Sequence, residues 1–203
     1  MANIFGGDMK NVNQVPSASQ RADALKQALD QKKLIPEGFL DDFNVMVTED
    51  WRPENAANVI AKAWLDPDFK ARLLKDGTAA CAELGYSGVQ GEYIHVLENT
   101  PLLQNVVVCT QCSCTAWPIL GFPKEWYKSP EYRARLVRES RQVLTELGLS
   151  LPEEVEIRVT DTSAETRFLV LPERPDGTEG WDQERLAAIV TYETMVGIAR
   201  VNL

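Results

Sequence analysis

NVVVCTQCSC, residues 105–114, joins a run of β-branched valines to a tight group of three cysteines. Valine favours extended backbone, so this run predicts a strand that ends at Cys109. The chain has only four cysteines and one histidine, and Cys109, Cys112 and Cys114 all lie in this stretch. Three thiolates this close can converge on one metal ion. We therefore predict a short loop, at the end of a strand, that carries the chemistry of the protein.

Along the chain, the spacing of apolar residues differs before and after this loop. Helical spacing predominates before the loop, and alternation returns after residue 153. Helices followed by a mixed unit of helices and strands define the α+β class. Pro118, Gly121 and Pro123 argue against regular structure directly after the cysteines. The predicted strands are 93–97, 105–108, 154–161, 166–171 and 195–201, and the predicted helices include 18–32, 78–84, 132–138, 143–147 and 184–192, the last capped by Asp182.

The first 50 residues differ from the rest of the chain. Residues 1–16 are rich in Asn and Gly and predict a flexible tail. The helices expected up to residue 50 carry few large apolar residues per turn, so they predict an arm that covers a partner surface or docks on its own domain. We therefore divide the chain into a tail and helical arm, 1–50, and a layered α+β domain, 51–203, that carries the cysteine loop.

The composition excludes several classes of protein. Of the 203 residues, 44% are hydrophobic and 25% are charged, which is typical of a globular chain. Lys and Arg number 21 against 30 Asp and Glu, and the net charge of −9 argues against nucleic acid and anionic membranes as partners. The sequence has no apolar run of about 18 residues, as a membrane helix needs, and its start does not resemble a signal peptide. We expect a cytoplasmic protein whose thiols are kept reduced.

Three common types of cysteine site fit the cluster poorly. Structural zinc sites and iron–sulfur clusters usually take four ligands, and neither Cys81 nor His95 forms a recognisable second pair. A redox-active dithiol would use Cys109 and Cys112, but it leaves Cys114 unexplained. A non-catalytic metal-binding or redox module built on this CxxC pair remains an alternative.

Chelate geometry favours a different site. The Cys114 sulfur and its own backbone nitrogen close a five-membered ring with a metal, and the Ser113 backbone nitrogen and the Cys112 sulfur complete a plane. The Cys109 sulfur can then approach from an axial direction. Deprotonated amide nitrogens need a strongly Lewis-acidic ion, which indicates a trivalent transition metal. These five donors leave one coordination position open, as a catalytic metal requires.

The cluster and its flanks closely resemble the metal-binding segment of the nitrile hydratase α subunit. The resemblance extends over nearly the whole chain after residue 18, so it is far more specific than a lone CxxC. The segments that carry it are 108–121 (VCTQCSCTAWPILG), 76–80 (DGTAA), 90–93 (QGEY), 126–129 (WYKS), 132–135 (YRAR), 157–159 (IRV) and 174–181 (RPDGTEGW).

The resemblance implies an enzyme that hydrates a nitrile to an amide at a low-spin, non-haem and non-corrin Fe(III) or Co(III) centre, with one ion per α subunit. It implies that Cys112 becomes a sulfinate and Cys114 a sulfenate, while Cys109 stays a thiolate. Cys112 and Cys114 would then be catalytic residues, with the Cys114 sulfenate acting as nucleophile or base. The added negative charge implies a β subunit that supplies arginines, in an αβ heterodimer or a higher oligomer.

The sequence carries features of both metal types of this family. Thr110 stands where its cobalt enzymes have Thr and its iron enzymes have Ser. Residues 115–117, 85–86 and 90–93 resemble the iron enzymes, and Gln111 departs from both types, which usually have Leu. We favour Fe(III), with Co(III) as the alternative.

Further residues and a rival function follow from the same resemblance. Gln90 would lie near the metal as a catalytic group that orients ligands or bound water, with a surface loop position as the alternative. Trp117 would line an apolar substrate pocket together with Gln90, or pack as plain core. Cys81, among small helical residues, should be a buried inert thiol. The nearest rival enzyme is the metal-binding subunit of a thiocyanate hydrolase, which uses a similar cluster and which the Trp117 flank disfavours.

Overall fold

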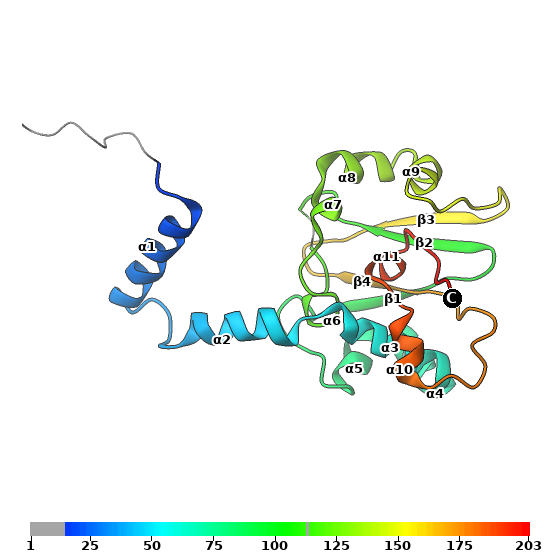
Figure 1. Ribbon diagram of the computed structural model, residues 1–203, viewed down its shortest axis with the longest axis horizontal. Helices are drawn as coiled ribbons and strands as arrows, with labels where there is room; N and C mark the ends of the chain where they lie inside the picture. The colour runs from blue at the N-terminus through cyan, green and yellow to red at the C-terminus, as the bar shows by residue number, and fades with distance from the viewer. Residues whose placement is uncertain (1–14, 113) are drawn as a thin grey trace, which may run out of the picture. The chain divides into compact units, whose positions relative to one another are not determined.

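The computed structural model describes residues 15–112 and 114–203. Its contacts divide the chain into two compact units, the first ending at Asn44 and the second running from Val45 to Leu203. The first unit is helical, and the second combines helices with two small sheets (Figure 1), which confirms the α+β class. The π-helix η1 (Met46–Asp50) belongs to the second unit, and the domain boundary expected after residue 50 stays a prediction.

The first unit contains α1 (Ala18–Gln31) and most of α2 (Phe39–Val45). A capping box begins α1: the Ser17 hydroxyl accepts a hydrogen bond from the Gln20 backbone nitrogen, and the Gln20 side chain accepts one from the Ser17 backbone nitrogen. Neither helix contains a buried residue. These helices therefore depend on local capping and helical propensity rather than on a core of their own. The tail expected over residues 1–16 lies largely outside the described residues.

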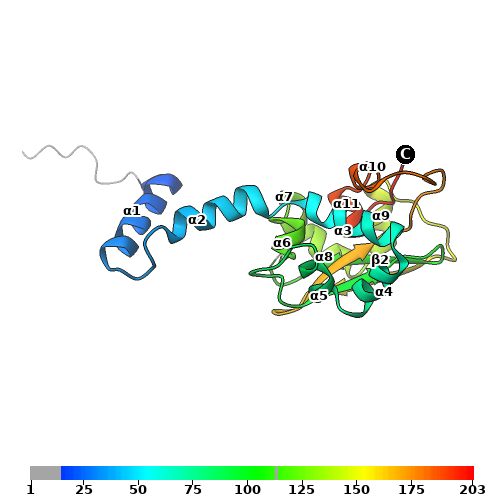
Figure 2. The same cartoon turned by 90° about the horizontal axis from the view of Figure 1, so that it is seen from below.

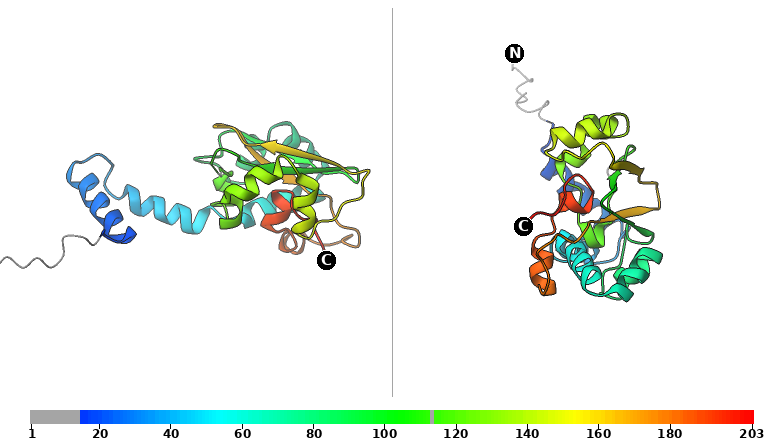
Figure 3. Two further views of the ribbon diagram at one scale, coloured as in Figure 1. Left: turned by 90° about the horizontal axis from the view of Figure 1, so that it is seen from above. Right: turned by 90° about the vertical axis from the view of Figure 1, so that its right-hand side faces the viewer.

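In the described part of the second unit, four strands form two parallel pairs. β1 (Ile94–Glu98) pairs with β4 (Arg167–Leu171), and β2 (Leu103–Val108) pairs with β3 (Glu156–Asp161). These are the predicted strands with ends shifted by one or two residues. Parallel neighbours need long connections, so each pair joins segments that are distant in sequence. β2 also lies beside β4, which places both pairs in one core (Figure 3).

Helices pack against both pairs of strands. α9 lies against β3, and α4 and α5 lie against β1 (Figure 1). α3 lies between α4 and α10 (Figure 2). The bounds are α3 (Pro53–Leu65), α4 (Pro67–Lys75), α5 (Gly77–Ala82), α6 (Trp117–Leu120), α7 (Glu125–Lys128), α8 (Pro130–Leu136), α9 (Ser140–Glu146), α10 (Gln183–Ala188) and α11 (Tyr192–Met195).

The longest helix of this unit, α3, shows why these residues form a core. It begins at Pro53, where the missing backbone N–H costs nothing. Val59 and Ile60 on its inner face are fully buried. Asp66 then separates α3 from α4, because its side chain accepts a hydrogen bond from the Phe69 backbone nitrogen at 2.9 Å and so caps the next helix.

The predicted strand at 195–201 is wrong. The described chain there is the end of α11 followed by a loop, and the Val107 backbone nitrogen donates to the Val196 carbonyl at 2.9 Å. Gly197 has φ 85°, and a Cβ atom on it would lie 1.9 Å from the Asn105 carbonyl oxygen. The apolar pattern of this segment therefore reflects a loop pressed onto β2 rather than a strand. The predicted helix 184–192 is likewise broken, because Thr191 caps a separate helix, α11.

The expectation of irregular structure after the cysteines is also wrong. α6 forms one helical turn directly after the loop, with Pro118 in its first turn, where proline is tolerated. Gly121, at φ 65°, ends the turn. Prolines and glycines here set the limits of a short helix rather than preventing one.

Candidate metal centre

The cysteine loop begins where the strand β2 ends. Val106, Val108 and Cys109 are buried, so the strand and the first cysteine are fixed in the core. The Thr162 backbone nitrogen donates to the Val108 carbonyl at 2.8 Å, which continues the parallel pairing to the edge of the cluster. Cys109 is therefore held by both packing and sheet hydrogen bonds.

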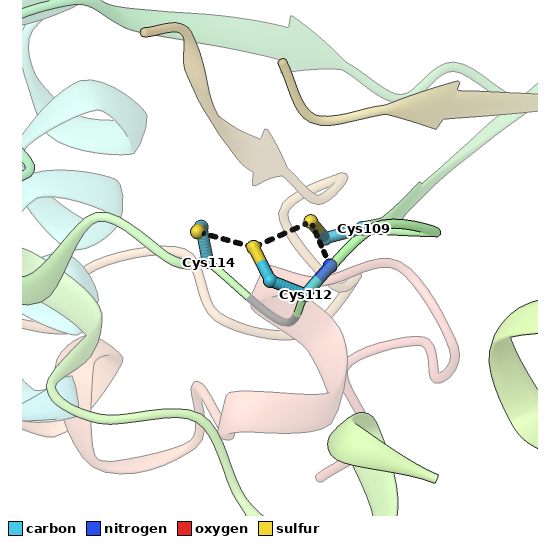
Figure 4. A group of neighbouring side chains, drawn as sticks. All are labelled: Cys109, Cys112 and Cys114. Atoms are coloured by element: carbon cyan, nitrogen blue, oxygen red, sulfur yellow. Dashed lines mark hydrogen bonds between the residues drawn. The ribbon is translucent and has the colours of Figure 1, made fainter. Parts of the chain in front are cut away.

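The three sulfur atoms converge, as the sequence predicted (Figure 4). The Cys112 sulfur lies 3.3 Å from the Cys109 sulfur and 2.6 Å from the Cys114 sulfur. The Cys112 backbone nitrogen also donates to the Cys109 sulfur at 3.4 Å. All three sulfurs lie within 4.8 Å of one another. Ser113, whose backbone nitrogen was predicted as a ligand, lies outside the described residues.

The three cysteines differ in exposure. Cys109 is 1% exposed, Cys114 is partly buried and Cys112 is exposed. Burial raises the pKa of the Cys114 thiol to about 11, and the hydrogen bond and charge of Cys112 act in the same direction. The positive charge of Arg167 opposes this rise in the pKa. Binding of a cation at this point would favour the thiolate instead.

Two charged side chains hold the loop at Thr110. The Asp161 carboxylate accepts from the Thr110 backbone nitrogen at 2.9 Å and from the Thr110 hydroxyl at 2.5 Å. On the other side, Arg133 Nη1 donates to the Thr110 carbonyl at 3.1 Å. Asp161 reaches Thr110 because β3 pairs in register with β2, opposite Val108. The first residue of the loop is therefore fixed from two directions.

Gln90 is held by the buried arginine Arg167. It is half-buried and has φ 67°, the left-handed conformation that is uncommon for residues other than glycine. Its side-chain oxygen accepts hydrogen bonds from Arg167 Nε, at 2.9 Å, and from Arg167 Nη2. The next residue, Gly91, packs so closely on Pro118 that a Cβ atom would lie 2.9 Å from the proline ring. The Gln90 loop thus rests on the segment that follows the cysteines.

Trp117 belongs to an aromatic group next to the loop. Its ring lies 5.3 Å from that of Trp51 and 4.9 Å from that of Phe122, between centroids. It is partly buried, and its indole N–H is buried without a hydrogen-bond partner among the described residues. The structure therefore gives Trp117 an apolar environment, and its role as a wall of the substrate pocket stays a prediction.

The fourth cysteine lies elsewhere, in α5. Cys81 is fully buried, and this burial raises its pKa to about 12. Its thiol is therefore neutral and protected, as expected for an inert core cysteine.

Sequence reasoning missed three residues that hold the site: Asp161, Arg133 and Arg167. For Asp161 a signal was present, because a charged residue that ends a strand parallel to β2 must lie beside the start of the cysteine loop. Arg133 and Arg167 gave no local signal, since their partners are 23 and 77 residues away in sequence.

The donor set fits a transition-metal ion. Three thiol sulfurs facing one point supply soft donors, which select transition metals over magnesium or calcium. The described residues offer no other group of three or more His, Cys, Asp or Glu side chains close enough to share an ion. This is not the closed four-ligand arrangement of structural zinc.

Comparison with known proteins agrees with this chemistry. The family model described as nitrile hydratase, alpha chain, matches residues 16–199. The nitrile hydratase α subunit of a Rhodococcus species is 50% identical over 183 residues, which are 90% of this chain and 92% of that one. The α subunit of a cobalt-containing nitrile hydratase from Pseudonocardia thermophila is 48% identical over 179 residues, 88% of each chain. The chain belongs to the nitrile hydratase α-chain family.

Solved structures show the same fold. A double mutant of the Fe-type nitrile hydratase from Comamonas testosteroni Ni1 has a TM-score of 0.84 and 47% identity, over 90% of this chain and 89% of that one. A recombinant thiocyanate hydrolase with partially modified cobalt centres has a TM-score of 0.87 and 40% identity, over 93% and 92%. These solved relatives thus include an iron-type and a cobalt-containing enzyme. Within the part of the chain that is described, no helix is long and apolar enough to cross a bilayer.

Proposed function

We propose that the chain binds one trivalent ion through the sulfurs of Cys109, Cys112 and Cys114 and the backbone nitrogens of Ser113 and Cys114, and hydrates nitriles there. The single observation that carries this proposal is the convergence of three sulfurs at the end of β2. The ion, when bound, would supply Lewis acidity to the reacting nitrile or water. The protein supplies a loop whose first residue is fixed from both sides, which pre-organises the donors.

We propose Fe(III) as the ion, with Co(III) as the alternative. The relatives include both an Fe-type and a cobalt-containing enzyme, so overall similarity does not separate them. Thr110 favours cobalt by the family pattern, and the segment at Trp117 favours iron. Elemental analysis of the purified complex decides between the two ions, and zinc at one ion per chain would contradict both.

The exposure of the cysteines supports the proposed oxidation states. A sulfinate at Cys112 and a sulfenate at Cys114 require access for an oxidant, and these are the exposed and the partly buried thiol. Cys109, proposed to stay a thiolate, is buried. Peptide mass spectrometry should find two added oxygen atoms on Cys112, one on Cys114 and none on Cys109.

Three side chains of this chain, Cys114, Gln90 and Trp117, have proposed roles in nitrile hydration. Hydration joins the oxygen of water to the nitrile carbon, and both hydrogens finish on the nitrogen to give the amide. The oxidised Cys114 sulfur places an oxygen beside the substrate, which serves as nucleophile or as the base that takes the proton from water. The Gln90 amide orients water or substrate by hydrogen bonding, and the Trp117 indole contributes an apolar wall.

We further propose that a β subunit completes the enzyme, as an αβ heterodimer or a higher oligomer in the cytoplasm. A net charge of −9 together with oxidised cysteines calls for positive groups from outside this chain. The helices α1 and α2, which bury no residue, offer a surface for such a partner. Size-exclusion chromatography of the chain with and without its partner gene product tests this assembly.

The decisive test of the function replaces one sulfur. Cys114→Ser should abolish both metal content and amide formation, because a hydroxyl is a poor ligand for this ion. Cys81→Ser is the matched control, since the same exchange in α5 removes no proposed ligand. Full turnover by the Cys114→Ser complex would contradict the role given to Cys114.

A thiocyanate hydrolase remains the competing function. It is favoured by the TM-score of 0.87 to such an enzyme, and by the thiocyanate hydrolase γ subunit from Thiobacillus thioparus, which is 48% identical over 158 residues. That match covers 72% of this chain, less than the 90% covered by the Rhodococcus nitrile hydratase. Acetonitrile and thiocyanate supplied to the same purified complex separate the two. Turnover of thiocyanate alone would favour the rival.

A further inference from the structure

A buried arginine without a carboxylate partner lies at the edge of the proposed metal centre. Arg167 is 2% exposed, and it belongs to no ion pair among the described residues. Its guanidinium donates to the backbone carbonyls of Ser163, at 2.8 Å, Thr166, at 3.0 Å, and Ala164, at 3.1 Å. Its remaining hydrogen bonds go to the side-chain oxygen of Gln90.

The contacts of Arg167 leave its charge uncompensated. Neutral oxygens satisfy its N–H groups but carry no full negative charge, and a buried charge is costly unless an anion lies nearby. The cysteine cluster can become anionic, and Arg167 acts electrostatically on Cys114. A cation enclosed beside an anionic cluster is stabilised by it, and in turn stabilises its negative charge.

The same contacts fix the orientation of the Gln90 amide. Two N–H groups of one guanidinium hold its oxygen, so that its NH₂ group is the end that remains to donate elsewhere. The left-handed backbone at Gln90 is unfavourable for a residue with a side chain, so surrounding contacts must hold it. Arg167 and the packing of Gly91 on Pro118 are those contacts.

We propose that Arg167 is a positioning residue of the metal centre, which aims the Gln90 amide donor at the reacting groups and supplies a fixed positive charge beside the cysteine loop. This inference rests on the proposed function. It differs from compensation by a partner subunit, because the charge comes from β4 of this chain. Gln90 is then a hydrogen-bond donor in the reaction, with no capacity to act as an acceptor there.

The test compares Arg167→Gln and Gln90→Glu with Arg158→Gln in the complete, metal-loaded complex. Arg158, on β3, is exposed and pairs with Glu156, so it is the matched control. Arg167→Gln should lower kcat by about tenfold or more with KM little changed, because a donor aimed at the transition state is lost. It should also shift the sulfur-to-metal charge-transfer band, since a charge beside the sulfurs is removed. An unchanged kcat and an unchanged band would overturn the proposal.

The Gln90→Glu variant distinguishes a positioning role of Arg167 from a purely structural one. A glutamate keeps the oxygen that Arg167 holds and pairs with its charge, so the fold is retained, but it lacks the NH₂ donor. We expect the same loss of kcat and the same direction of band shift as in Arg167→Gln. Normal kcat with a normal band in Gln90→Glu would show that Arg167 only supports the loop. This variant also answers the question if Arg167→Gln does not fold.

A double-mutant cycle completes the test. If Arg167 acts through Gln90, Arg167→Gln should change kcat much less in a Gln90→Ala background than in the wild type. Additive losses would overturn this coupling. A wild-type complex that binds metal but hydrates no nitrile would refute the proposed function, and the charge-transfer band would still test the position of the Arg167 charge.

Discussion

The arm and the domain both contain amphipathic helical patterns, but only the domain buries them. α1, with 14 residues, has no buried residue, whereas α3, with 13 residues, buries seven. Both begin with a recognisable N-terminal signal, a capping box in α1 and a first-turn proline in α3. Local sequence therefore predicts that a segment is helical, and burial depends on whether the fold brings a complementary surface to it.

This difference locates the stability of the chain. Burial of apolar area is the main stabilising term, so the free energy of unfolding should reside almost entirely in the unit from Val45 to Leu203. The arm retains exposed apolar side chains, such as Leu25 and Phe39, for another surface. Substitutions in the two units should therefore change the free energy of unfolding by different amounts.

The largest effect should come from Gly197→Ala in the domain. A Cβ atom there would lie 1.9 Å from the Asn105 backbone oxygen, so the backbone at residue 197 and the strand β2 would have to move apart. We expect a loss of more than about 4 kcal/mol in unfolding free energy, or failure to fold. Gly180→Ala is the control, because Gly180 also has positive φ but nothing within 4 Å of a Cβ atom. Urea unfolding measures both, and equal losses would mean that φ, rather than packing, sets the effect.

The next effect compares one truncation in each unit. Ile60→Ala removes a fully buried side chain from α3 and should cost about 2–5 kcal/mol. Leu25→Ala in α1 removes a side chain that is 61% exposed and should change stability by less than about 0.5 kcal/mol. Chemical denaturation of both variants measures the two losses of unfolding free energy. Similar losses would contradict the difference between the two units, since they would require a buried environment for Leu25.

A smaller, pH-dependent effect should mark the buried Cys81. Burial raises its pKa from 9.0 to about 12, so the folded state favours the neutral thiol. Its contribution to stability is therefore fully present below pH 9.0 and is lost as the pH rises towards 12. The difference in unfolding free energy between the wild type and Cys81→Ala should shrink above pH 9.0. A difference that stays constant to pH 11 would indicate an accessible thiol at this position.

The smallest effect should come from deleting residues 1–38. Because the removed helix α1 buries nothing, the thermal unfolding of the remaining chain should match that of the full chain within about 0.5 kcal/mol. Differential scanning calorimetry of both forms, without the partner, makes the comparison. The same deletion should weaken assembly with the partner. A large loss of stability without the partner would show that the arm belongs to the core.

Much of the domain could be predicted because its signals are local. The valines of β2, the cap at Asp182 and the first-turn proline of α3 each act within a few residues. The wrong strand has a clear cause: the segment 195–201 has strand-like apolar spacing, yet it forms a loop that β2 holds through the Val107–Val196 hydrogen bond. Spacing alone does not distinguish a buried loop from a strand.

The sequence by itself determined that three cysteines lie in one short loop, where their side chains are close neighbours, and it determined the family through segments spread along the chain. Tertiary structure alone decided which thiol is buried, and it decided what holds the loop. Asp161 meets Thr110 across 51 residues and Arg167 meets Gln90 across 77. Parallel strand pairing and close packing create these contacts, and both are properties of the folded chain that no local stretch of sequence contains.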